Sequence, residues 1–277
     1  MSLVFARFRR QLAALTGVAL DADKQYLVEN RLAPVMRANG VAGFSELADA
    51  MERRDNPTLV GEVVDAIATN ETLFFRDRTP FEAFHDRVLP ELMAARSRER
   101  RLRFWCAACS TGQEAYSLAM TLDQEARALR GWNIEILATD LSATAIDAAR
   151  KGIYSRFEVQ RGLPTGQLLC YFHRDDDNWR INEHMRARII FRDFNLLSDF
   201  DDLGKFDVIF CRNVLMYFEP EVKASVLSRL SFVLADDGYL FFGASENVGA
   251  ANANFSQVSR DGVWRSRRHA RPQLRLA

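Results

Sequence analysis

Apolar residues recur at helical spacing through the first quarter of this chain. Phe5, Phe8 and Leu12 fall three or four residues apart, which places them on one face of a helix. Pro57 stands where the first turn of another helix is expected. The sequence therefore predicts an all-helical domain over residues 1–69, with helices at Phe5–Thr16, Asp23–Asn39, Phe44–Arg53 and Pro57–Ala68.

From residue 101 the pattern changes to short, mostly apolar runs that alternate with longer amphipathic stretches. Wholly apolar runs are typical of parallel strands covered by helices on both faces, so we predict an α/β domain over residues 101–277. We expect its strands at Leu102–Ala107, Ile134–Asp140, Ile189–Phe194, Phe206–Cys211, Tyr239–Gly243, Phe255–Val258 and Val263–Arg267. We expect helices at Ala143–Lys151 and Pro220–Leu234.

Two segments interrupt this order. Residues 70–100 form a connector between the two domains, with a helix from Pro80 to about Arg96. Residues 157–188 break the alternation of strands and helices, and Asp175–Asn178 is a strong turn signal inside them. The sequence therefore predicts a small hairpin-like β insertion, with strands at Leu168–Phe172 and Trp179–Ile181.

Composition narrows the possible function classes. The 37 basic and 37 acidic residues cancel, which argues against a nucleic-acid partner. No apolar run reaches the ~18 residues of a membrane span, so direct membrane insertion is not expected. Cys106 and Cys109 form a C-x-x-C pair, but without a second pair we predict no metal site. Reduced cysteines and the lack of a signal-peptide pattern lead us to expect a cytoplasmic protein.

The first strand of the α/β domain runs into a turn of small residues, Ala108–Gly112, and then into a helix. Parallel α/β sheets bind nucleotide-like ligands at such junctions, yet no dinucleotide-binding or phosphate-loop motif is present. Glu114 stands at the helix start, where a phosphate site favours a basic residue. This carboxylate suits a cationic ligand or a ligand amine; the alternative is that it only complements the helix dipole.

The second strand ends in Asp140, at the position where an acidic residue typically accepts hydrogen bonds from ribose hydroxyls. The alternative role for Asp140 is the N-cap of the next helix, but Ser142 is able to fill that role alone. We therefore favour the ribose interpretation. Two acidic residues at neighbouring strand ends also strengthen the interpretation of Glu114 as a ligand contact.

The connector contains two unusual features. Phe74 and Phe75 stand among polar residues, so we expect them to fix this segment on the α/β domain while its polar residues line a ligand cleft. An arginine run follows and is expected to be a solvated face: Arg96, Arg98, Arg100, Arg101 and Arg103. The basic tail that follows Arg265 is expected to be mobile.

Six segments together resemble the chemotaxis receptor methyltransferase family of the CheR type. They are NETLFFRD (70–77), FWCAACSTGQEAYSLAM (104–120), ILATDLS (136–142), GIY (152–154), FDVIFCRNVLMYF (206–218) and GYLFFGASEN (238–247), in the family's order. The resemblance implies an all-helical N-terminal domain joined to a Rossmann-like S-adenosylmethionine methyltransferase domain with a small β-subdomain insertion. It implies methyl transfer from S-adenosylmethionine to glutamate carboxylates of chemoreceptors, with S-adenosylhomocysteine as the product.

The resemblance also implies a set of cofactor-binding residues. They are Asn70, Thr72 and Arg76 at the methionine end, Glu114 at its amino group, Asp140 at the ribose, Asn195 and Leu196 at the adenine, and Arg212 and Asn213 beside the reactive methyl. Because a glutamate carboxylate is already ionised at neutral pH, the transfer needs no general base. The protein has to hold carboxylate and methyl in line and exclude water.

An arginine over the site would orient the substrate carboxylate through a bidentate contact. By analogy with the family, our candidate is Arg98 or its neighbour Arg96. Tyr217 is a second orienting candidate, for which packing in the core is an equal alternative.

The implied partner is the cytoplasmic helical domain of chemoreceptors, which docks on the second helix of the front domain in this family. Arg31 and Arg37 match two of the basic docking positions, whereas Pro34 and Val35 replace others. The insertion is shorter than in members that hold a receptor's C-terminal peptide, so we do not expect that tether. Two alternatives stay open: a catalytically silent signalling module that binds S-adenosylmethionine, and a methyltransferase for another protein or a small acid.

Overall fold

The computed structural model describes residues 3–21, 23, 25–53, 56–244, 246, 254–259 and 262–266. Beyond Ser266 the basic C-terminal tail lies outside the described residues, as does the end of the last predicted strand. The first part of the chain is helical, as predicted, and the first strand begins at Arg101.

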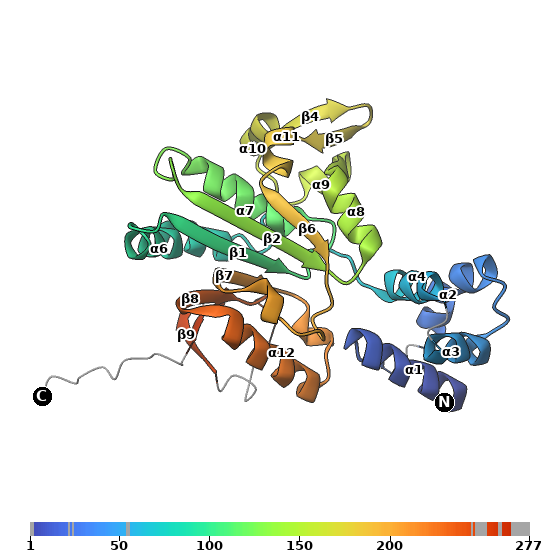
Figure 1. Ribbon diagram of the computed structural model, residues 1–277. Helices are drawn as coiled ribbons and strands as arrows, with labels where there is room; N and C mark the ends of the chain where they lie inside the picture. The colour runs from blue at the N-terminus through green and yellow to red at the C-terminus, as the bar shows by residue number, and fades with distance from the viewer. Residues whose placement is uncertain are drawn as a thin grey trace, which may run out of the picture.

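The N-terminal helices are α1 (Leu3–Thr16), α2 (Gln25–Ala38), α3 (Phe44–Arg53) and α4 (Pro57–Ile67). Their apolar faces share one buried core, and Phe8, Leu12 and Leu32 are fully buried in it. Asn56 caps α4 by accepting a hydrogen bond from the Leu59 amide at 3.0 Å. In Figure 1 these helices lie beyond the arrowheads of β2 and β6, at the carboxyl edge of the sheet.

The rest of the chain is built around a seven-stranded sheet in the order β6-β2-β1-β7-β8-β10-β9. The first five strands in that order are parallel, whereas β10 runs antiparallel to both of its neighbours. The strands are β1 (Arg101–Ala107), β2 (Asn133–Asp140), β6 (Ile189–Asp193), β7 (Phe206–Cys211), β8 (Leu234–Phe241), β9 (Phe255–Ser259) and β10 (Val263–Ser266). This is the predicted α/β architecture, although β8 begins five residues before the expected start at Tyr239.

Helices cover both faces of the sheet, which explains the apolar strands. Alternate residues of β1 point to opposite faces: Phe104 packs in the core under α7 (Gln113–Gln124), and Trp105 in the core under α12 (Pro220–Val233). Figure 1 shows α7 and α8 (Ala143–Lys151) on one side of the sheet and α12 on the other.

Phe74 and Phe75 of the connector pack against the α/β domain, as expected. Phe74 is fully buried and meets Tyr154 edge-on at 5.0 Å, and Phe75 packs against Phe81. The predicted helix is continuous but contains one π-helical turn, so it consists of α5 (Thr79–Ala83), a π segment (Phe84–Val88) and α6 (Leu89–Ala95).

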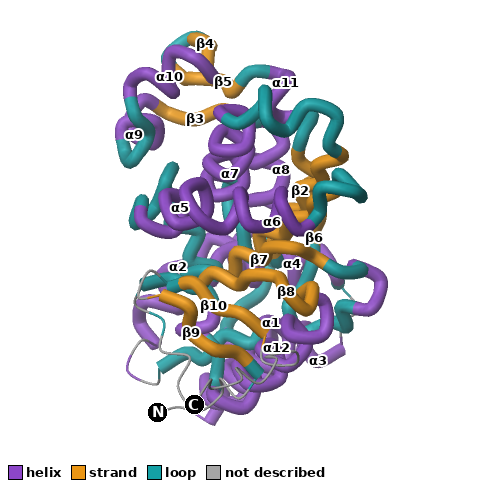
Figure 2. Tube along the Cα trace, turned by 90° about the vertical axis from the view of Figure 1, so that its left-hand side faces the viewer, coloured by secondary structure: helices purple, strands orange, loops and turns teal. Residues whose placement is uncertain are grey.

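The insertion forms a separate three-stranded sheet in the order β3-β5-β4. It begins at Ile153, earlier than the predicted residue 157, because β3 pairs with β5. Its elements are β3 (Ile153–Ser155), α9 (Arg156–Gln160), α10 (Thr165–Tyr171), β4 (Phe172–Asp175), β5 (Asn178–Ile181) and α11 (Glu183–Arg186). The predicted strand Leu168–Phe172 is wrong, because Leu168 and Tyr171 bury one helical face while Leu169 is exposed. Figure 2 shows this sheet at the opposite end of the molecule from α1 and α3.

Candidate functional site

One pocket opens at the carboxyl ends of β1, β2 and β7, between the sheet and the helical domain. Its empty space is about 1030 Å³, a figure that includes open solvent at its mouth. The connector, the strand ends and the helical domain all contribute to its walls. The predicted residues that line it are Asn70, Thr72, Arg76, Glu114, Asp140, Asn195, Leu196, Arg212, Asn213 and Tyr217.

The helical domain is hydrogen-bonded to the loops that border the pocket. The Ala19 amide donates to the Tyr217 carbonyl at 2.8 Å. The Asn195 side chain donates to the Leu15 carbonyl at 2.7 Å, and its own oxygen accepts from the Leu197 amide. These two hydrogen bonds fix the orientation of the Asn195 amide in the pocket wall.

Three non-glycine residues that line the pocket have a left-handed backbone conformation. Ala108, Ser110 and Asn213 have φ values of +60°, +51° and +59°, although none of them is glycine. Each follows the carboxyl end of β1 or β7. Left-handed conformations of non-glycine residues cost of order 1–3 kcal/mol each and are enriched at functional sites.

Glu114 lies in the first turn of α7 and is buried. Its Oε2 accepts a hydrogen bond from Arg212 Nη1 at 2.9 Å. Burial raises the pKa of the Glu114 carboxyl, and the neighbouring Arg212 opposes that shift only in part. A second cation beside this carboxylate would offset its desolvation, so the site suits a ligand ammonium group.

Asp140 links the junction between β1 and α7 to the junction between β2 and α8. Its Oδ2 accepts from the Ser110 amide at 2.7 Å and its Oδ1 from the Ser142 amide at 2.9 Å. Burial raises the pKa of Asp140, against the lowering effect of these amide hydrogen bonds. Ser142 caps α8 at the Ala145 amide, as predicted, so each Asp140 oxygen keeps lone-pair capacity for a ligand hydroxyl.

Arg212 connects three parts of the pocket. Besides Glu114, its guanidinium donates to Asp77 Oδ2 at 2.7 Å and to the Arg76 carbonyl at 2.9 Å. Its Nε is buried and has no hydrogen-bond partner among the described residues. Asp77 was not among the predicted site residues, although the segment that carried the resemblance ends with it.

The remaining predicted residues sit at the connector wall and the mouth. The Asn70 carbonyl accepts from Ser110 Oγ at 2.9 Å, and Arg76 donates one hydrogen bond to the Glu71 carbonyl. Tyr217 is 37% exposed at the pocket, so packing in the core does not account for it.

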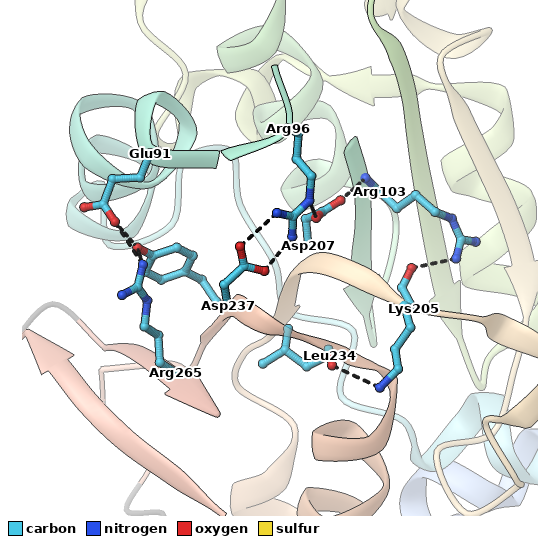
Figure 3. Close-up of polar contacts among 9 residues, drawn as sticks. Glu91, Arg96, Arg103, Lys205, Asp207, Leu234, Asp237 and Arg265 are labelled. Carbon is cyan, nitrogen blue, oxygen red and sulfur yellow. Dashed lines mark hydrogen bonds and ion pairs between the residues drawn. The ribbon is translucent and has the colours of Figure 1, made fainter. Parts of the chain in front are cut away.

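Arg98 does not lie at this pocket, and the expectation that it contacts a substrate there is wrong. It is exposed in the turn between α6 and the amino end of β1. Because β1 spans seven residues, that turn and the pocket are about 20 Å apart at opposite ends of the strand. Its neighbour Arg96 binds Asp207 and Asp237 at the same far edge (Figure 3).

The cysteine pair and the chain's helices give two further findings. Cys106 and Cys109 are free and buried, and burial raises the pKa of both thiols. Within the described ranges, no three His, Cys, Asp or Glu side chains are grouped so that they could hold a metal ion. No helix in the part of the chain that the structure describes is long and apolar enough to cross a membrane.

Comparisons with known proteins agree with this geometry. Residues 4–68 match the family model for the CheR methyltransferase all-alpha domain, and residues 70–263 match the one for its SAM-binding domain. Chemotaxis protein methyltransferase 1 of Pseudomonas aeruginosa is 44% identical over 92% of this chain and 93% of that protein. Chemotaxis protein methyltransferase Cher2 of Pseudomonas putida is 40% identical over 93% and 94%. The chain therefore belongs to the CheR methyltransferase family and is an enzyme that uses S-adenosylmethionine.

Proposed function

We propose that this protein transfers the methyl group of S-adenosylmethionine to glutamate side chains of chemoreceptors. The observation that carries the proposal is the convergence of Glu114, Asp140 and Arg76 on one pocket at the carboxyl edge of the sheet. The two carboxylates suit a cationic nucleoside, and the arginine suits an anionic acceptor. The names of the relatives support chemotaxis as the setting.

The residues in the pocket fit the parts of S-adenosylmethionine. Glu114, held by its hydrogen bond from Arg212, offers a carboxylate to the α-ammonium group. Asp140 has acceptor capacity for the ribose hydroxyls. Phe194 and Leu196 give the pocket an apolar wall for the adenine. When bound, the cofactor supplies a methyl group made electrophilic by its sulfonium.

The acceptor requires orientation rather than activation. A glutamate carboxylate is ionised at neutral pH, so the protein's task is to hold it in line with the methyl group. Arg76 lines the pocket, and its guanidinium geometry matches a carboxylate. We therefore assign to Arg76 the role that the resemblance had suggested for Arg98, in place of the contact with the methionine end that was expected of Arg76. Tyr217 lines the same pocket and is the second orienting residue. The helical domain, bonded to the loop at Tyr217, covers this side of the pocket against water.

The docking surface for the receptor is assigned to α2. Arg31 and Arg37 are exposed there, but Arg31 also donates to the Ile67 carbonyl at 3.1 Å at the end of α4. Arg37 is therefore the more available cation for an acidic receptor helix. The connection between β4 and β5 is the two-residue turn Asp176–Asp177, so the insertion is short. For this reason we expect no binding of a receptor's C-terminal peptide.

The experiment combines the purified protein, methyl-tritiated S-adenosylmethionine and a chemoreceptor cytoplasmic fragment. The proposal predicts label on the receptor that alkali releases as methanol, because glutamate methyl esters are base-labile. A receptor fragment with its acceptor glutamates changed to glutamine is the matched control and should stay unlabelled. Cofactor binding without transfer would instead support a silent signalling module, and alkali-stable label would support another kind of acceptor.

A further inference from the structure

A buried carboxylate that neither the sequence analysis nor the proposed mechanism uses lies just behind the pocket. Glu246 is 8% exposed and accepts four backbone hydrogen bonds. Its Oε2 accepts from the amides of Asn213 and Gly243 at 2.9 and 2.8 Å. Its Oε1 accepts from the amides of Val214 and Leu215 at 3.0 and 2.8 Å.

These four amides belong to two neighbouring strand ends. Three of them open the loop that follows β7, and this loop carries Asn213 and Tyr217 to the pocket. The fourth follows β8. The loop begins with a strained residue, since Asn213 has a φ of +59°. A fixed acceptor for the first amides of the loop offsets the free-energy cost of this conformation.

Gly243 shows how closely the two strand ends are fitted. A Cβ atom built on Gly243 would lie 2.6 Å from Asn213 Nδ2 and 3.1 Å from its backbone nitrogen. A side chain at this position would therefore push Asn213 away from the place where Glu246 holds it. Glu246 holds the backbone amide of Asn213 by a hydrogen bond, and Gly243 leaves the space that the Asn213 side chain occupies.

We infer that Glu246 is a positioning residue for methyl transfer, which sets the geometry of the 213–217 loop by collecting its amide hydrogens. The inference rests on the proposed function for its kinetic consequence only. Glu246 makes its contacts to backbone groups, so it acts on the reaction through Asn213 and Tyr217.

The Glu246→Gln variant tests this with minimal change of shape. The glutamine NH₂ group would face two backbone N–H donors wherever it is placed, so two of the four hydrogen bonds are lost. Glu246→Ala removes all four, and Gly243→Ala displaces Asn213 while leaving the carboxylate in place.

Asp207, on β7, provides a matched control. It is also 8% exposed, but it lies at the amino end of β7, where its oxygens accept from Arg96 Nε and the Arg103 amide (Figure 3). Asp207→Asn introduces the same chemical change at the far edge of the sheet. If buried carboxylates matter only for stability, the two variants should have similar consequences.

The experiment measures amide exchange by mass spectrometry, cofactor affinity by calorimetry, and kcat and KM for the receptor fragment. For Glu246→Gln we expect amide protection over residues 213–215 to fall roughly tenfold. We expect kcat/KM for the acceptor to fall at least about tenfold, and S-adenosylhomocysteine affinity to change less than about threefold. Asp207→Asn should lower the melting temperature and leave the acceptor kcat/KM unchanged.

Two outcomes would overturn the inference. They are unchanged protection and kinetics in Glu246→Gln, or an equal kinetic loss in Asp207→Asn. If Glu246→Ala does not fold, the Gln variant and Gly243→Ala decide. Should the wild-type protein fail to methylate receptors, lost protection in Glu246→Gln would still support the positioning of the loop, and the fault would lie with the proposed function.

Discussion

Arg212 and Glu114 form a buried ion pair, 2.9 Å between Nη1 and Oε2, that joins the carboxyl end of β7 to the first turn of α7. The Arg212 side chain is 1% exposed, and its second nitrogen also binds Asp77. The pair therefore links the connector to the two strand ends that face the cofactor. A carboxylate fixed in this way has one oxygen committed to Arg212 and is held ready for a ligand ammonium.

Cofactor binding should depend on pH through Glu114. Burial raises its pKa in the free protein, and an ammonium ligand favours the ionised carboxylate. As pH falls from neutrality through that raised pKa, Glu114 takes up a proton, so affinity should decline and binding should release a proton. Asp140, whose pKa is also raised by burial, acts in the same direction because hydroxyl donors favour its ionised form.

Calorimetric titration with S-adenosylhomocysteine in two buffers of different ionisation enthalpy measures that proton. In Glu114→Gln the pH dependence should be weaker, because only the contribution of Asp140 remains. Affinity that stays constant with pH, together with no proton release, would contradict the assignment.

Removing Arg212 should destabilise the fold more than removing an exposed arginine. Arg212→Met leaves Glu114 and Asp77 without their cation, and breaking a buried pair from one side costs about 3–5 kcal/mol. Arg98→Ala should change stability by less than about 0.5 kcal/mol, because Arg98 is exposed. Urea unfolding of both variants checks this, and equal midpoints would be inconsistent with a buried ion pair at Glu114.

The ribose assignment of Asp140 predicts a loss that depends on the ligand. In the wild-type protein, an S-adenosylhomocysteine analogue without its ribose hydroxyls should bind more weakly by about 1.5–3 kcal/mol, the value of a hydrogen bond to a charged group. In Asp140→Ala the two ligands should bind almost equally. Calorimetry with both ligands and both proteins gives the coupling directly, and additive losses would exclude the contact.

The acceptor assignment predicts different results for two arginines. Arg76→Lys keeps the charge but loses the bidentate geometry, so kcat/KM for the receptor fragment should fall about tenfold or more. Arg98→Ala should transfer methyl groups like the wild type, since Arg98 lies at the other end of β1. Steady-state kinetics with saturating cofactor separates them; a loss in Arg98→Ala alone would reverse the assignment.

The architecture was predictable because its signals are local. An unbroken apolar run such as Phe206–Cys211 reports burial on both faces, and β7 has the predicted bounds. Helical spacing fixed the first four helices to within a few residues. The secondary structure of the insertion was harder to predict. Leu168 and Tyr171 have helical spacing, but they lie in a segment so short that helix and strand patterns overlap.

Parts of the site were not predictable because they depend on distant contacts. Arg98 stands just before the predicted strand Leu102–Ala107, so the strand pattern itself indicates the amino edge of the sheet, and the substrate role came from the resemblance alone. The bond from Asn195 to Leu15 joins residues 180 positions apart. Glu246 had no hydrophobic pattern to mark it, and its role rests on amides from two separate strand ends.

The most direct test of the account is a calorimetric titration of S-adenosylhomocysteine into the wild-type protein and the Glu114→Gln and Asp140→Ala variants at neutral pH. The account predicts that the wild-type protein binds and that each variant binds at least about tenfold more weakly, with Arg98→Ala as the unaffected control. Wild-type affinity in both carboxylate variants would contradict it, because the cofactor would then be held by something other than these two strand ends.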